Sequence, residues 1–160
     1  METNTTILAA QPFLKGLPER YLEVLASAAI PVEFATGKQI FNEGGAANRF
    51  YLLTSGEVAL ESSGDDRDDE RKPMLIETIG AGDVLGWSWM FPPYCWHFDA
   101  RAISPVKAIF FYGSRLREQC EQDHDLGYEL MRRTAEVVIG RLQATRRQLL
   151  ETGSRPLQLM

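Results

Sequence analysis

The chain has 160 residues, 44% hydrophobic and 24% charged, which is the ordinary balance of a folded globular domain and excludes a disordered, collagen-like or low-complexity protein. Its 17 basic and 22 acidic side chains leave a net charge of −5, so the surface as a whole is a poor match for a nucleic-acid backbone. Residues 1–6 contain no basic or apolar leader, and the longest uncharged stretch, Val84 to His97, is too short and too polar to span a membrane. We therefore expect a cytoplasmic protein.

The sequence has too few cysteines and histidines to predict a fold stabilised by disulfide bonds or by a bound metal. Cys95 and Cys120 are the two cysteines, and without a secretory signal we expect both to be free thiols. Only His97 stands near Cys95 as a basic neighbour, which favours an inert thiol over a redox-sensitive one. His97 and His124 are too scattered for a metal site. Because the sequence also lacks a nucleophile–base set, a P-loop and a GxGxxG motif, we expect no enzymatic activity.

An N-terminal helical segment is predicted over residues 1–30. Apolar residues recur at helical spacing from Pro12 to Ala29, and Pro18-Glu19-Arg20 is typical of a helix start.

Short apolar runs divided by glycine-containing turns occupy residues 31–113. Their spacing of about ten residues predicts an antiparallel β-barrel or sandwich. The acidic run from Asp65 to Glu70 lacks the central glycine and distal glutamate of a calcium loop, so we interpret it as a solvated hairpin loop. The predicted strands lie at 31–34, 39–41, 50–53, 57–61, 74–79 and, in two pieces, 100–112.

The last third, residues 114–152, is predicted to be helical and is followed by a tail over 153–160. A short helix over Leu116–Gln122 precedes a cap at 123–125 and a long helix from Leu126 to Thr152. At 1.5 Å per residue the long helix extends about 40 Å, which exceeds what a small barrel can cover. We therefore expect its distal part to pair with the same helix of a second copy, forming a homodimer. The residues predicted for this dimerisation seam are Leu130, Val137, Leu142 and Leu149.

The order of the turns and strands resembles the cyclic-nucleotide-binding domain, in particular the sensor half of the Crp/Fnr bacterial regulators. The segments that carry the resemblance are Gly37, Glu43-Gly44-Gly45, Phe50-Tyr51-Leu52-Leu53, Ser55-Gly56-Glu57-Val58 and the run from Gly80 to Gly86. The resemblance extends from Phe13 to Leu150. It implies a mainly β fold, an eight-stranded jelly-roll β-barrel with a short N-terminal helix and a long C-terminal dimerisation helix.

The resemblance also implies a phosphate-binding cassette over residues 86–98. Family members that bind a cyclic nucleotide carry a glutamate directly after the glycine that corresponds to Gly86, and an arginine about ten residues later that is followed by a hydroxyl residue. Here Trp87, Trp96 and His97 occupy these three positions, so both charged anchors are replaced. We therefore expect cyclic AMP and cyclic GMP to bind weakly or not at all. The candidate ligand-binding residues carried over by resemblance are Gly86, Trp87, Ser88, Trp96, His97, Phe98, Arg101 and Thr145.

The cassette is unusually aromatic, with six rings in twelve residues and a spacing of two on either side of Pro92-Pro93. If the chain is extended, each triplet lies on one face. Two interpretations remain open: Trp87 and Trp96 fill the volume of a nucleotide, or the rings form a cage for a flat or apolar ligand. Arg101 is either an anion contact or a structural partner of Asp99 or Asp83.

Two functions follow from these alternatives. The first is a stand-alone ligand sensor that signals through its dimeric helix, and the second is a degenerate, ligand-free interaction module. Crp/Fnr regulators continue into a helix-turn-helix domain, and no such unit is visible here, so we expect no direct DNA binding by this chain. The volume behind Gly86 distinguishes the two functions, because an open polar cavity favours a sensor and a tryptophan-filled one favours the module.

Overall fold

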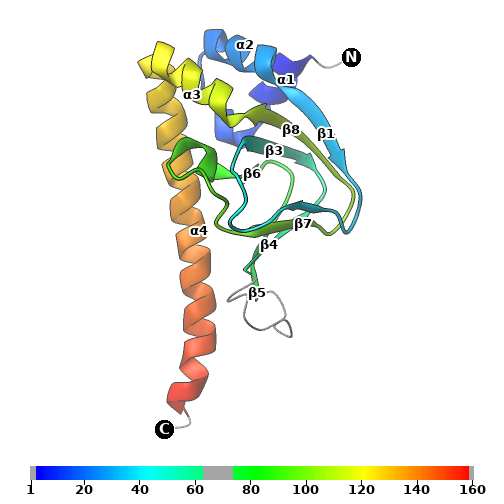
Figure 1. Ribbon diagram of the computed structural model, residues 1–160, viewed down its shortest axis with the longest axis vertical. Helices are drawn as coiled ribbons and strands as arrows, with labels where there is room; N and C mark the ends of the chain where they lie inside the picture. The colour runs from blue at the N-terminus through cyan, green and yellow to red at the C-terminus, as the bar shows by residue number, and fades with distance from the viewer. Residues whose placement is uncertain (1–2, 63–73, 159–160) are drawn as a thin grey trace.

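Two four-stranded antiparallel sheets face each other, and helices cover one end and one side of them (Figure 1). The computed structural model describes residues 3–62 and 74–158, with side chains described through Glu151. This architecture confirms the predicted jelly-roll with flanking helices. The acidic run from Asp65 to Glu70 lies outside the described residues.

The strands pair in an order that differs from their order in the chain, as a jelly-roll requires. One sheet has the order β1 (Ile30–Phe34), β8 (Val106–Tyr112), β3 (Arg49–Ser55) and β6 (Val84–Leu85). The other has the order β2 (Gln39–Phe41), β7 (Asp99–Ala102), β4 (Val58–Ser62) and β5 (Met74–Ile79). The two strands that flank the cassette, β6 and β7, therefore belong to opposite sheets, and the cassette bridges the layers.

Strand β3 supplies side chains to two separate hydrophobic cores. Successive side chains of a strand point to opposite faces. Tyr51 and Leu53 accordingly pack between the two sheets, whereas Phe50 and Leu52 pack beneath the helices. This double burial explains why residues 50–53 of β3 are continuously apolar instead of alternating.

The N-terminal segment contains three short helical pieces: α1 (Asn4–Ala9), η1 (Pro12–Leu14) and α2 (Glu19–Ala28). The predicted helical region from Pro12 to Ala29 thus divides into a single 3₁₀ turn and a regular helix. Helix α1 lies within the predicted helical segment 1–30 but before the helical spacing that begins at Pro12, and its threonine-rich sequence has low helix propensity. The structure stabilises it through burial of Leu8, which is 0% exposed, and through the side chain of Thr3, which caps it.

The chain ends in helices α3 (Gly113–Gln122) and α4 (His124–Gln158). The carboxylate of Asp123 accepts hydrogen bonds from the backbone N–H groups of Asp125 and Leu126 at 3.1 and 3.2 Å, which confirms the predicted cap. Helix α4 continues past Thr152 into the segment predicted as a tail. No described helix has the length and hydropathy that crossing a bilayer requires.

Helix α4 runs beside the sheets and then projects beyond them (Figure 1). Leu130 is 2% exposed in the core beneath the helices, and Val137 packs against the same core. These two predicted seam residues therefore contact the helix's own domain. Leu142 and Leu149 are 66% and 65% exposed and lie outside the domain's own core.

Candidate functional site

The candidate site lies where the chain leaves strand β6 and enters the short helix η2 (Trp87–Met90). Gly86 makes this turn with φ of +92°, a left-handed conformation that favours glycine. A Cβ atom at Gly86 would lie 2.6 Å from Cζ3 of Trp96. The absence of a side chain at Gly86 therefore allows the indole of Trp96 to pack directly against the backbone of the cassette.

Trp96 fills the space behind Gly86. Its side chain is 6% exposed, and its ring stacks on that of Phe41 with centroids 3.9 Å apart and planes 10° apart. The remaining cavity has a volume of about 10 Å³. One water molecule already needs about 10–15 Å³, whereas a nucleotide-sized ligand needs about 300 Å³ or more. In this structure the site is thus closed by the protein's own tryptophan.

The polar groups of the cassette are bonded to each other. The hydroxyl of Ser88 lies 2.9 Å from Nδ1 of His97, and the imidazole of His97 stacks on Trp87 with centroids 4.8 Å apart. Ser88 is buried, Trp87 is half-buried and His97 is exposed. Together with Phe98, which also lines the cavity, these residues are brought together as the resemblance implied.

The cation at the cavity comes from helix α4, and the sequence analysis missed it. The Arg141 guanidinium lies 3.3 Å from a carboxylate oxygen of Glu77 and donates a hydrogen bond to the carbonyl of Val84 at 2.6 Å. Its side chain is only 12% exposed. Arg141 is one helical turn before Thr145, a predicted ligand-binding residue, and that spacing is the signal that would have identified it.

Two predicted site residues lie away from the cavity. Arg101 makes a two-pronged ion pair with Glu61, with N–O distances of 3.1 and 3.3 Å, and this pairing raises the pKa of Arg101 further above its ordinary value. Ala100 and Ala102 face the core between the sheets, so strand alternation directs Arg101 to the outer face. The hydroxyl of Thr145 donates to the carbonyl of Arg141 within its own helix. Neither Arg101 nor Thr145 lines the cavity.

The first aromatic triplet does not share a face. A shared face required an extended chain, but residues 87–90 form a 3₁₀ helix, which turns successive side chains in different directions. Trp89 is consequently 0% exposed in the core beneath the helices, whereas Phe91 is 39% exposed. A spacing of two places side chains on one face only where the chain is extended, and residues 87–90 are helical.

The structure thus combines a jelly-roll, a cassette between its two sheets and a long helix beside them. Residues 31–123, more than half of the chain, match the model of the cyclic nucleotide-binding domain family. The chain therefore belongs to that family.

Three relatives illustrate this membership. A proposed cyclic nucleotide-binding protein from Geobacter metallireducens is 30% identical, with a TM-score of 0.76 over 89% of this chain and 99% of its own. A CRP-like cAMP-activated global transcriptional regulator from Mycobacterium tuberculosis is 26% identical over 91% of this chain, which spans 61% of that regulator's length. The regulatory subunit of a cAMP-independent protein kinase A from Trypanosoma brucei shares the fold, with 24% identity and a TM-score of 0.66 over 84% of this chain and 46% of its own. At family level these are regulatory and binding proteins, not enzymes.

Proposed function

We propose that this chain is a Crp/Fnr-type regulatory module whose nucleotide pocket is filled by Trp96 and which acts through dimerisation of α4 without binding cyclic AMP or cyclic GMP. The observation that carries the proposal is the residual cavity of about 10 Å³ beside the stacked rings of Trp96 and Phe41. This favours the ligand-free module over the sensor, the alternatives that the sequence left open.

Entry of a cyclic nucleotide would have two separate costs. The ring of Trp96 would have to leave a packed site, and truncation of such a ring typically costs about 3–5 kcal/mol. The buried phosphate would also need a cation, and Arg141 is already engaged by Glu77 and the carbonyl of Val84. We therefore expect a dissociation constant above roughly 100 µM, which corresponds to less than about 5.5 kcal/mol of binding free energy.

Isothermal titration calorimetry with cyclic AMP and cyclic GMP tests the closed pocket. We compare the wild-type chain with Trp96→Arg, which opens the space and supplies a cation, and with Trp96→Ala, which only opens the space. We expect no measurable heat for the wild type and for Trp96→Ala, and at least a tenfold gain for Trp96→Arg, the effect of one charge-assisted hydrogen bond. Low-micromolar binding by the wild type would overturn the proposal.

The exposed face of α4 has the pattern of a coiled-coil seam. Residues separated by alternating steps of three and four lie along it: Tyr128, Met131, Ala135, Val138, Leu142, Thr145 and Leu149. This heptad spacing is the one that aligns two helices along a common stripe. The large apolar members are strongly exposed, Met131 by 52% and Leu142 by 66%, which is costly for a helix that remains alone. The seam we propose thus retains Leu142 and Leu149 and replaces Leu130 and Val137.

Light scattering at micromolar concentration tests the dimer. The chain has a mass of 18.0 kDa, so we expect about twice that value in solution. A single species of monomer mass would overturn this part of the proposal while leaving the closed pocket untouched.

The sensor remains the second candidate, and the position of Arg141 favours it. This residue lines the closed cavity and belongs to α4, so displacement of Trp96 by a ligand would act directly on the dimerisation helix. A thermal-shift screen of the wild-type chain with cyclic nucleotides and small apolar compounds separates the two functions, because only a sensor is stabilised by a compound that binds behind Gly86.

A further inference from the structure

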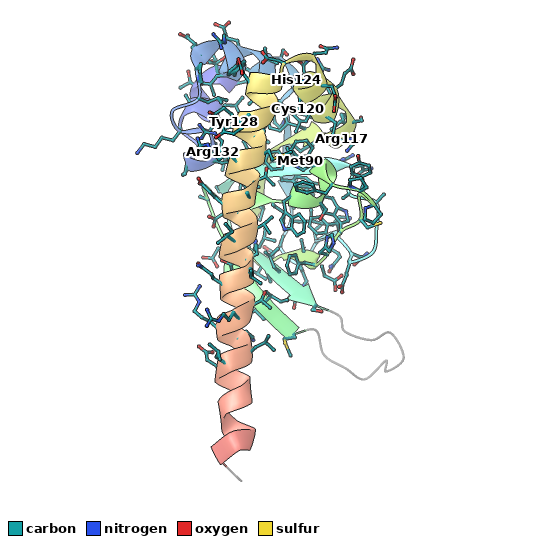
Figure 2. The ribbon with its side chains drawn as sticks, turned by 90° about the vertical axis from the view of Figure 1, so that its left-hand side faces the viewer. Met90, Arg117, Cys120, His124, Tyr128 and Arg132 are labelled. Carbon is teal, nitrogen blue, oxygen red and sulfur yellow. The ribbon has the colours of Figure 1, made fainter. Side chains whose placement is uncertain are left out.

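An open groove of about 570 Å³ lies between helix α4, the N-terminal segment and the turn that joins β5 to β6. Its α4 wall is one stripe at helical spacing, formed by Arg132, Glu136, Gly140, Gln143 and Arg147. At about 100° per residue, this stripe lies about 140° around the helix from the proposed seam, so groove and seam occupy different faces of α4. In Figure 2 Arg132 accordingly lies on the flank of α4 opposite to Met90 and Arg117.

Two largely buried arginines hold the walls of this groove in place. Arg133 is 10% exposed and donates to the carbonyls of Phe13 and Lys15 at 2.8 and 2.9 Å, which fixes the N-terminal segment to α4. Arg141 donates to the carbonyl of Val84 and thereby fixes the beginning of β6 to the same helix. The groove is therefore formed before anything binds to it, which lowers the ordering cost of binding.

Gly140 leaves the middle of the groove open. Glycine inside a helix is less favourable than alanine. A Cβ atom at Gly140 would nevertheless meet no atom within 4 Å, so the packing of the domain does not require a glycine there. Because Gly140 lines the groove, a larger side chain at this position would enter the space of a bound molecule. Occupation of the groove thus accounts for a glycine that the packing leaves unexplained.

Cations outnumber carboxylates in the lining of the groove, although the chain as a whole has a net charge of −5. The basic side chains are Lys15, Arg132, Arg133, Arg141 and Arg147, and the acidic ones are Glu77, Asp83 and Glu136. Several of these charges already match each other. Arg141 pairs with Glu77, and Arg132 pairs with Glu136. Glu129, which does not line the groove, pairs with both Arg132 and Arg133.

Lys15 and Arg147 are the cations that these pairs leave unmatched. Both are exposed, and within the described part of the chain neither side chain forms an ion pair. The carboxylate of Asp83, the remaining acid, accepts a hydrogen bond from the N–H group of Gly80 at 2.9 Å. Helix α4 advances about 21 Å from Arg133, which holds the backbone of Lys15, to Arg147. An extended peptide covers that distance with about six residues.

We propose that this groove binds an extended acidic peptide segment of a partner protein, with carboxylates on Lys15 and Arg147 and the peptide backbone passing over Gly140. Carboxylates at these two cations disrupt no ion pair of the described structure. Arg132 at the rim is 46% exposed, and its surface pairs are weak enough for a third carboxylate to compete for it. This partner surface rests neither on the closed pocket nor on the dimer of α4.

The probe is fluorescein-labelled hexaglutamate, and the readout is fluorescence anisotropy at about 50 mM salt, where exposed charges are less screened than at physiological ionic strength. We expect a dissociation constant below about 1 mM, and binding of labelled hexaglutamine at least tenfold weaker. Lys15→Gln and Arg147→Gln should each weaken hexaglutamate binding about threefold, and the double variant about tenfold, because the effects of distant sites add.

Gly140→Phe tests the shape of the groove without any change of charge. It should weaken hexaglutamate binding at least tenfold, because the ring occupies the middle of the groove, whereas Gly140→Ala should stay within a factor of two of the wild type. Arg115→Gln is the matched charge control, since Arg115 is exposed on α3 and does not line the groove. It should also leave the affinity within a factor of two.

Three results would overturn the proposal. The first is an unchanged anisotropy at protein concentrations up to about 1 mM. The second is wild-type affinity in a Gly140→Phe variant that circular dichroism shows to be folded, or an equal loss in Arg115→Gln and Arg147→Gln, because either indicates attraction to the general surface. The third is hexauridylate that binds more tightly than hexaglutamate and loses its binding in Gly140→Phe, which would assign the groove to RNA instead of a peptide.

Discussion

Replacement of Trp96 by alanine is the most direct test of the closed pocket. The ring is 6% exposed and lies against both Phe41 and the backbone of Gly86. Removing a buried tryptophan ring costs about 3–5 kcal/mol through lost burial and the cavity that remains. We expect the upper half of this range, because the stack on Phe41 adds about 0.5–1.5 kcal/mol and the sheets on either side limit collapse of the space.

The assay is urea unfolding followed by far-UV circular dichroism, at one protein concentration, because dimerisation makes the apparent stability depend on it. Trp87→Ala is the matched control, because Trp87 is the same residue type in the same cassette. Unlike Trp96 it is only half-buried, and one face of its ring stacks on His97. It should cost about 1 kcal/mol. A loss below about 1 kcal/mol for Trp96→Ala would refute the filled pocket and revive an aromatic cage for a ligand.

Three further predictions concern the seam, the outer sheet face and Cys120. Leu142→Glu should yield a monomer of 18.0 kDa in light scattering, because it places two like charges opposite each other in the seam. In a Trp96→Arg background, Arg101→Gln should leave the binding of cyclic nucleotides unchanged in calorimetry, because Arg101 pairs with Glu61 away from the cavity. In a Cys95→Ser background, the rate at which iodoacetamide alkylates Cys120 should keep rising about tenfold per pH unit up to about pH 11. The rate for an ordinary thiol, with a pKa near 9.0, would level off near pH 9.

Each of these predictions has a control and a contrary result. Leu150→Glu alters an equally exposed leucine outside the seam and should remain dimeric, so equal dissociation of both variants would contradict the seam. A changed nucleotide response in Arg101→Gln would place that cation in the site after all. A Cys120 rate that levels off near pH 9 in protein still folded by circular dichroism would show that the thiol is not shielded by burial and its acidic neighbours.

The strands and the long helix were predictable because each is marked by a pattern of residues close together in the sequence. Glycine turns about ten residues apart mark the strand ends, and the stripe along the C-terminal third has a helical period over many turns. The cap at Asp123 was likewise readable, since a short acidic side chain before an apolar run satisfies the free N–H groups of a helix. From the sequence we also predicted that Trp87 and Trp96 stand at the positions of the family's charged anchors.

What those tryptophans do was decided by the tertiary structure. Whether an aromatic residue lines a cavity or fills it depends on its distance from strands remote in sequence, and Phe41, 55 positions away from Trp96, determines that here. The sequence alone also did not determine which side of α4 packs on the domain. Leu130 and Leu142 have equal hydrophobicity, and only the position of the sheets buries Leu130 and exposes Leu142. Contacts between distant elements also decided which arginine lies at the cavity. Strand alternation directs Arg101 to the outer face of its sheet, and the packing of α4 brings Arg141 to the cavity. Local sequence thus determined the elements of this protein, and contacts between distant elements determined which of its side chains form the site.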